Sequence, residues 1–146
     1  MRIHENRGFE RWAPVLGRIL VGALFIMGGI GKITDFAGSV QYAEAFGVPF
    51  PALAIIIAII VELLGGILLV AGLLTRFASI LLALFLVVVT LYFHTNFADP
   101  TQMIAFLKNG AIIGGLLYMS VYGAQKAALK KCALPCDCVE GHKEEK

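Results

Sequence analysis

Hydrophobic residues along the chain gather in four long runs, at 14–33, 51–74, 77–94 and 103–122. Each run approaches or exceeds the roughly 18 to 20 apolar residues that an α-helix needs to cross a hydrocarbon core about 30 Å thick. Hydrocarbon offers no hydrogen-bond partner to an open backbone, so each run is predicted to be a helix. The pattern therefore predicts an all-α, polytopic membrane protein built as a four-transmembrane-helix bundle.

The connections between the runs are short, except for the first one. This segment, 34–50, contains glycine and proline, and within it 40–46 is expected to lie as a short interfacial helix anchored by Tyr42 and Phe46. The sequence thus divides into an N-terminal segment, a transmembrane domain and a Cys-containing tail, at 1–13, 14–122 and 123–146.

The charged residues suggest an orientation. Only 15% of the chain is charged, against roughly a quarter in soluble domains, and the formal net charge of +2 gives no broad basic surface for nucleic acid. The loops around 35–44 and 95–102 carry acidic residues only. Basic residues flank the remaining helix ends: Arg2, Arg7, Arg11, Arg76, Lys126, Lys130 and Lys131. The distribution predicts cytoplasmic N- and C-termini in a bacterial inner membrane.

Several polar side chains fall inside the hydrophobic runs, where lipid should not tolerate them. Glu62 lies near mid-membrane and needs either a proton or a cation. Cations and hydrogen-bonding groups are available in the same outer half on other helices: Lys32, His94, Lys108 and Asn109. These five residues are the candidates for an outward-facing ligand pocket.

Simpler interpretations stand beside the pocket. Glu62 and Lys108 would form a buried ion pair that only fixes helix packing, and His94 would be an interfacial histidine. Arg18 and Arg76 are expected to snorkel at the cytoplasmic interface. Glycines such as Gly29 and Gly66 would let neighbouring helices approach closely.

The tail offers a second, weaker candidate site. Its three cysteines and one histidine are the ligand types of a structural zinc centre: Cys132, Cys136, Cys138 and His142. Their spacing differs from the usual Cys-x2-Cys knuckles. The pattern favours unligated thiols over tail-bound zinc.

Taken in order along the helices, six short motifs resemble the DoxX family of small bacterial membrane proteins, in its short four-helix branch. The resemblance covers roughly 13–122, and the Cys-containing tail lies outside it. The motifs are Gly17-Arg18-Ile19, Gly28-Gly29-Ile30-Gly31-Lys32, Gly47-Val48-Pro49, Glu62-Leu63-Leu64-Gly65-Gly66, Gly72-Leu73-Leu74-Thr75-Arg76 and Phe93-His94-Thr95-Asn96-Phe97. The resemblance implies a link to thiosulfate, quinone or thiol redox chemistry.

Three functions follow as hypotheses. In the first, the protein supports membrane redox chemistry, as an oxidoreductase or a subunit of one, and Glu62, Lys108, His94 and Lys32 line a pocket for a quinone-like or small anionic compound. In the second, it is a non-catalytic scaffold or assembly subunit that holds partner oxidoreductases through its glycine-rich helix faces and its Cys-containing tail, and a homo-oligomer is a further option. In the third, the acid at mid-membrane couples small-molecule transport to protons.

Overall fold

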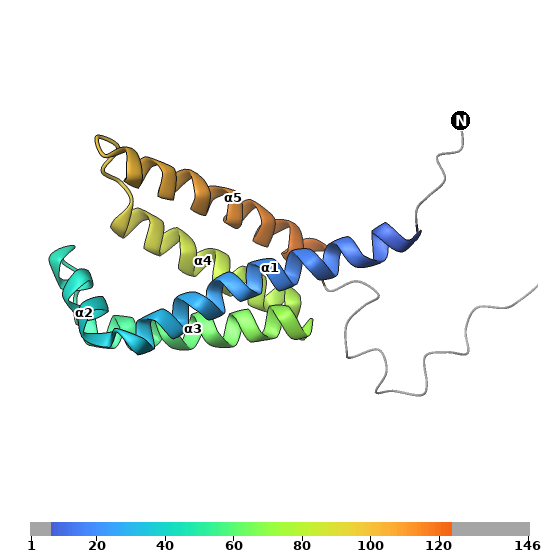
Figure 1. Ribbon diagram of the computed structural model, residues 1–146, viewed down its shortest axis with the longest axis horizontal. Coiled ribbons are helices and arrows are strands. Elements are labelled where there is room, and N and C mark those ends of the chain that lie inside the picture. Colours follow the sequence, from blue (N-terminus) through green and yellow to red (C-terminus); the bar gives the residue numbers. More distant parts are fainter. Residues whose placement is uncertain (1–6, 124–146) are drawn as a thin grey trace, which may run out of the picture.

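The computed structural model describes residues 7–123, with side chains from Trp12 onward. This part of the chain folds into five α-helices and contains no strand (Figure 1). They are α1 (Arg7–Thr34), α2 (Phe36–Ala45), α3 (Pro51–Ala71), α4 (Thr75–Phe93) and α5 (Pro100–Tyr122). All except α2 are long and apolar enough to cross a membrane, which confirms the all-α fold with four candidate transmembrane helices.

Local sequence signals explain where most helices begin and end. The helix α3 begins at Pro51, whose missing N–H is harmless in a first turn, and it ends at Gly72, which adopts a left-handed φ of 70°. That glycine ends the helix three residues before the predicted end at 74. By contrast, α1 begins at Arg7 and carries Pro14 inside it, so Pro14 does not start the helix as its position in the sequence suggested.

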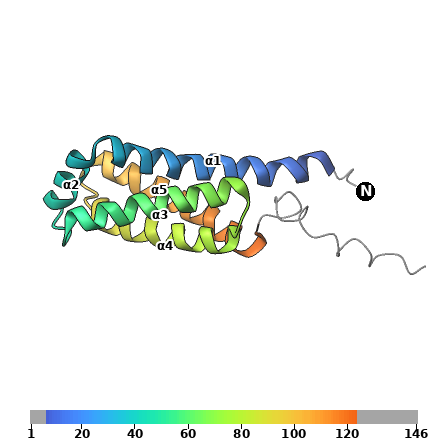
Figure 2. The same ribbon diagram turned by 90° about the horizontal axis from the view of Figure 1, so that it is seen from below.

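The short helix in the first connection is longer than the predicted 40–46. It begins at Phe36 because the Asp35 side chain accepts a hydrogen bond from the Gly38 N–H, at 3.0 Å, and so caps the first turn. Figure 2 shows α2 lying across one end of the bundle, which we call the α2 end. The opposite end, where α3 turns into α4 through Gly72, is the Gly72 end.

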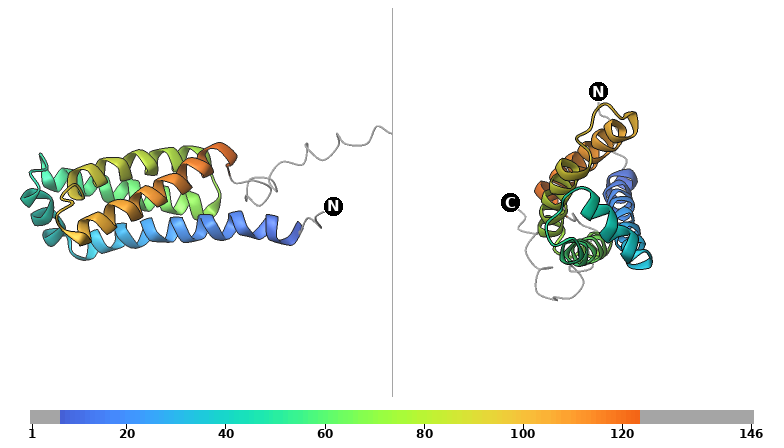
Figure 3. Two further views of the ribbon diagram at one scale, coloured as in Figure 1. Left: turned by 90° about the horizontal axis from the view of Figure 1, so that it is seen from above. Right: turned by 90° about the vertical axis from the view of Figure 1, so that its left-hand side faces the viewer.

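The helices associate as two pairs, with α1 against α3 and α4 against α5, and contacts between α3 and α4 join the pairs (Figure 3). Glycines bring α1 and α3 together. A Cβ placed on Gly22 would lie 2.8 Å from the Gly66 carbonyl oxygen, and one placed on Gly66 would lie 2.8 Å from the Gly22 carbonyl oxygen. Two backbones touch at this point, as in small-residue packing of membrane helices.

The buried core lies toward the Gly72 end. It contains Phe25 of α1, Leu69 of α3, Leu82 of α4 and Leu116 of α5, each of them 2% exposed or less. Toward the α2 end, α4 and α5 diverge from α1 and α3 (Figure 1). The bundle is therefore closed at one end and open to a cavity at the other.

Candidate ligand pocket

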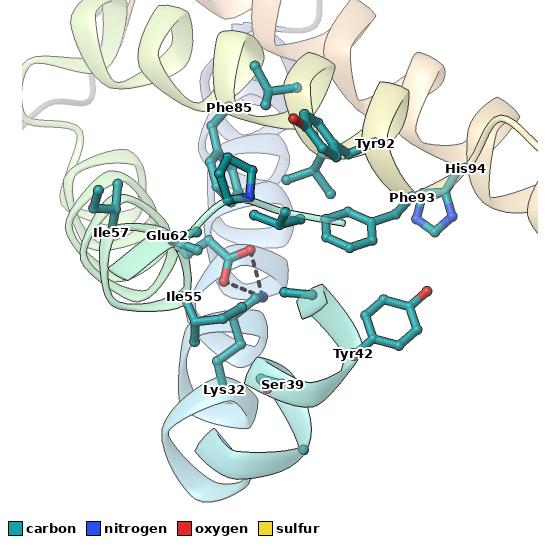
Figure 4. Close-up of a pocket in the computed structure, with 18 of the residues that line it drawn as sticks. Lys32, Ser39, Tyr42, Ile55, Ile57, Glu62, Phe85, Tyr92, Phe93 and His94 are labelled. Carbon is teal, nitrogen blue, oxygen red and sulfur yellow. Dashed lines mark hydrogen bonds and ion pairs between the residues drawn. The ribbon is translucent and has the colours of Figure 1, made fainter. Parts of the chain in front are cut away.

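A cavity of about 700 Å³ lies at the α2 end, between α4 and the helices α1 to α3 (Figure 4). Its lining is largely apolar and includes Ile55, Ala58, Val88 and Phe93. Four helices and the segment before α3 contribute to the wall, whereas α5 does not. A volume of this size lies in the range of pockets that hold small organic ligands.

An ion pair between Lys32 of α1 and Glu62 of α3 lies in the cavity wall, which also includes the polar residues Asp35, Ser39 and Tyr42. The Lys32 ammonium donates to both Glu62 carboxylate oxygens, with Nζ to Oε2 at 2.7 Å and Nζ to Oε1 at 3.0 Å. A third, longer hydrogen bond of 3.4 Å reaches the Gly28 carbonyl oxygen. The Lys32 and Glu62 side chains are 27% and 10% exposed. The pair is thus largely removed from solvent and forms part of the cavity wall.

Glycines on α1 make room for this pair. A Cβ placed on Gly28 would lie 3.3 Å from Glu62 Oε2, and one placed on Gly29 would lie 2.8 Å from the Leu63 side chain. A side chain at Gly29 would collide with the Leu63 side chain, and one at Gly28 would require the Glu62 carboxylate to shift by a few tenths of an ångström. The sequence spacing of Gly28, Gly29 and Lys32 therefore sets both the helix separation and the cation that meets Glu62.

Aromatic rings tie α2 to α4 beside the cavity. Tyr42 of α2 stacks on Phe93 of α4 with ring centroids 5.4 Å apart, and Phe46 meets the same ring edge-on at 5.1 Å. Such aromatic pairs stabilise a contact beyond the area they bury. Here they hold the short helix over the space between α3 and α4.

His94, the last residue contributing to the wall, follows α4 directly. Its Nδ1 lies 2.6 Å from Oε1 of Gln102 on α5, so this nitrogen carries the proton and the amide oxygen accepts it. The other ring nitrogen, Nε2, is left as the acceptor in the neutral ring. Figure 4 shows the ring beside Phe93 at the rim of the cavity. The sequence analysis did not identify Gln102 as a site residue. It lies in the first turn of α5, next to the end of α4.

The other candidates lie elsewhere. Glu62 pairs with Lys32, so the expected Glu62–Lys108 pair is not formed, and Lys108 is exposed on α5. Asn109 is buried, but its Nδ2 donates to Thr90 Oγ1 at 3.0 Å, and that hydroxyl donates to the Leu86 carbonyl oxygen. This chain of bonds links α5 to α4 outside the cavity. The difference arises because α1, not α5, is the helix that packs along α3.

The two arginines expected to snorkel differ from one another. Arg76 is exposed, and its side chain runs along Gly123 at the end of α5. Arg18 is only 3% exposed, and its guanidinium lies against Gly72 at the end of α3. The candidate zinc ligands Cys132, Cys136, Cys138 and His142 lie outside the described residues, and within 7–123 no group of three or more His, Cys, Asp and Glu residues could hold a metal ion.

These features define a class: a small polytopic membrane protein with an intramembrane cavity whose wall carries an ion pair. The sequence matches the DoxX family model over residues 13–95, more than half of the chain, and this range contains every residue that lines the cavity. The chain belongs to the DoxX family.

Two relatives have names that state a membrane location. The chain is 40% identical over 109 residues to Escherichia coli "Inner membrane protein YqjF", covering 75% of this chain and 82% of that protein. It is 34% identical over 122 residues to E. coli "Inner membrane protein YphA", covering 80% and 87%. A third relative, Bacillus subtilis "Putative oxidoreductase CatD", is 37% identical over 82 residues, covering 56% and 59%. No solved structure matches the chain.

Proposed function

We propose that the cavity binds a lipid-soluble quinone or quinol and that the protein supports membrane redox chemistry beside a partner oxidoreductase. The observation that carries this proposal is the composition of the cavity: an apolar space of about 700 Å³ with one ion pair in its wall and a histidine at its rim. An apolar ring with two oxygens needs such surroundings, because its body avoids water while each oxygen needs a hydrogen-bond partner.

The ion pair and the histidine offer different partners to the two oxygens of such a ring. The Lys32 ammonium already directs hydrogen bonds to three oxygens, which leaves lone pairs on Glu62 as free acceptors, beside Ser39 and Tyr42 of α2 in the same wall. The Glu62 lone pairs accept a hydrogen bond from a quinol hydroxyl. At the rim, the Nε2 of the neutral His94 ring accepts a hydrogen bond from the second hydroxyl. Electrons would come from the partner oxidoreductase.

The name of the B. subtilis relative, "Putative oxidoreductase CatD", supports a redox connection. The cavity lies within the range matched by the family model.

A titration with a short-chain quinone tests the proposal. Purified protein in detergent is titrated with decylubiquinone, and binding is followed by the quenching of protein fluorescence. Two variants should weaken binding in different ways: Glu62→Gln removes the carboxylate, and Ala54→Phe fills the cavity while leaving the ion pair intact. Lys108→Met is the matched control, since it removes a lysine from a transmembrane helix outside the cavity.

The expected result is a loss of binding of about tenfold or more for the first two variants and unchanged binding for the control. Equal affinity in all four proteins, or no saturable binding in the wild type, would refute the proposal. A thermal unfolding measurement on each variant shows whether a loss of binding reflects a loss of fold.

We also propose that the Gly72 end faces the cytoplasm, which places both termini there and opens the cavity toward the outer half of the membrane. The support is charge: Arg76 lies at the Gly72 end, whereas Asp35, Glu44 and Asp99 lie at the α2 end. A reporter enzyme active only in the periplasm, fused after Lys146, should stay inactive. Activity of that fusion would reverse the orientation.

A scaffold role is a second candidate, favoured by the exposed face of α5. A Cβ placed on Gly110 or Gly114 would meet nothing within 4 Å, and Lys108 on the same helix is exposed within the span. Small residues on an open face allow another helix to approach closely. Disulfide cross-linking of a Gly114→Cys variant in membranes, with the native cysteines replaced, would detect a second copy or a partner on this face.

A further inference from the structure

The Gly72 end holds further buried polar groups, separate from the cavity, that have no hydrogen-bond partner among the described residues. Arg18 of α1 is 3% exposed, and its Nε and Nη1 atoms make no hydrogen bond within the described part of the chain. The same holds for the hydroxyls of Thr75 and Ser79 on α4, which are 3% and 0% exposed. Buried polar groups are nearly always hydrogen-bonded, so a set of partnerless donors at one end of a bundle calls for an occupant.

Helix packing brings these groups to the same level. Gly22 of α1 touches Gly66 of α3 backbone to backbone, and the two helices run in opposite directions. One turn back along α1, the Arg18 guanidinium lies directly against Gly72, in the space that a Cβ on Gly72 would take. Gly72 precedes Thr75 by only three residues, so the guanidinium and the start of α4 share one level of the bundle.

The hydroxyls face the same interior. Thr75 and Ser79 stand one turn apart and therefore lie on one face of α4. Leu82, on that same face, fills the space beside Gly65 of α3. The face thus points into the bundle.

The start of α4 adds further donors. Its first-turn N–H groups have no partner within the helix, and the residue before it, Leu74, adopts a φ of 46° and supplies no side-chain cap. A helix start of this kind carries a partial positive charge that favours an anion. The start of α4 thus favours an anion, while the Thr75 and Ser79 hydroxyls can both donate and accept, and the α3 end beside Arg18 presents backbone carbonyls.

The described acids cannot supply the missing negative charge. Of the four between Trp12 and Gly123, Asp35 and Glu44 belong to α2 or its cap, and Asp99 caps α5 at the same α2 end. Glu62 is already paired with Lys32. Among the acids whose side chains the structure describes, none stands at the Gly72 end, so a bound anion would complete the buried guanidinium.

From this geometry we infer that the Gly72 end binds a phosphate-type oxyanion between α1, α3 and α4. The planar guanidinium of Arg18 provides the fork that matches two oxygens of a phosphate, and the hydroxyls of Thr75 and Ser79 donate to further oxygens. The phosphate belongs either to an anionic phospholipid or to free inorganic phosphate. Both present the same tetrahedral oxygens to the site.

Two binding measurements on the full-length protein separate these sources. Native mass spectrometry in a neutral detergent compares retention of added phosphatidylglycerol with that of phosphatidylcholine. Thermal unfolding in the same detergent compares sodium phosphate with sodium chloride at equal ionic strength. Retention of phosphatidylglycerol alone assigns the site to a lipid headgroup, and a rise in unfolding temperature in phosphate alone assigns it to the free ion.

The variants distinguish an anion site from a merely structural cluster. Arg18→Gln should weaken retention or the phosphate effect about tenfold or more, and Lys108→Gln, an exposed lysine in the other half, should change neither. The double variant Thr75→Val, Ser79→Ala is more telling. It removes two hydroxyls that have no partner among the described residues, so without phosphate or lipid the protein should unfold at the same temperature or higher. The rise in unfolding temperature caused by phosphate, or the retention of phosphatidylglycerol, should be smaller than in the wild type.

Three results would overturn the inference. The first is equal retention of both lipids together with equal unfolding temperatures in phosphate and chloride. The second is an anion effect that survives Arg18→Gln. The third is a double variant that is destabilised without any anion and keeps the full anion effect, since that would make the hydroxyls structural.

Discussion

Substituting Lys32 and Glu62 one at a time tests how much their ion pair contributes to the stability of the bundle at the cavity. Lys32→Met leaves a carboxylate in an apolar wall, and Glu62→Gln leaves an ammonium whose remaining acceptor is the Gly28 carbonyl oxygen at 3.4 Å. Removing one partner of a fully buried pair costs about 3–5 kcal/mol. The Lys32 side chain is 27% exposed, so screening lowers the expected cost to about 2–3 kcal/mol for each single variant.

The double variant Lys32→Met, Glu62→Met should behave differently. It removes both charges and replaces them with apolar side chains of similar length, a change that is often neutral in buried pairs. The free energy of unfolding should therefore stay within about 1 kcal/mol of the wild type. The two single losses would then add to about 4–6 kcal/mol against a double loss of about 1 kcal/mol or less, which gives an interaction energy of at least about 3 kcal/mol.

The free energies are obtained from unfolding in mixed micelles of rising dodecyl sulfate content, followed by helical circular dichroism without added quinone. Two results would refute the reasoning: single variants that each lose less than about 0.5 kcal/mol, or a double variant whose loss equals the sum of the singles. The first would mean that the pair is solvated, and the second that each side chain acts alone.

Two further predictions follow from helix packing and helix capping. Gly66→Ala should destabilise the protein by about 1–3 kcal/mol because its Cβ meets the Gly22 carbonyl oxygen, whereas Gly110→Ala, which meets nothing within 4 Å, should be neutral or stabilising in the same unfolding assay. The Thr101 hydroxyl and backbone N–H lower the pKa of Asp99 below its ordinary value of 3.8. The folded state therefore favours the carboxylate, and the stability that Asp99 contributes is full above pH 3.8 and lost as the pH falls through the lowered pKa. Unfolding temperatures of wild type and Asp99→Asn should converge in that acid range, and a difference that stays constant with pH would contradict this role.

The transmembrane helices could be predicted from the sequence because each satisfies a one-dimensional rule of length and apolarity. The end of α3 was misplaced by three residues because hydropathy does not register the left-handed conformation at Gly72. The sequence does contain a signal for the start of α2, the capping residue Asp35. The prediction of 40–46 relied on the aromatic anchors Tyr42 and Phe46 and did not use this signal.

The site was harder to predict because depth along a helix says nothing about which helix is the neighbour. Lys32 and Lys108 both lie in the half of the bundle between Glu62 and the α2 end. Lys32 is the lysine that pairs with Glu62 because α1 packs along α3. Arg18 shows the same difficulty. Its position near the end of a hydrophobic run suggests snorkelling, but the sequence does not show that its guanidinium packs against Gly72 of the neighbouring helix end.

The position of Glu62 also bears on how the protein enters the membrane. A charge near the centre of a helix opposes insertion by about 2.5–3.5 kcal/mol, whereas each leucine, isoleucine or valine there favours it by roughly 0.3–0.6 kcal/mol. The helix α3 consists mostly of these residues, so it can insert with its acid still alone. Since α1 is synthesised first, Lys32 is already in the bilayer when Glu62 arrives. The ion pair then forms between two inserted helices and strengthens the contact between α1 and α3 that glycine packing makes.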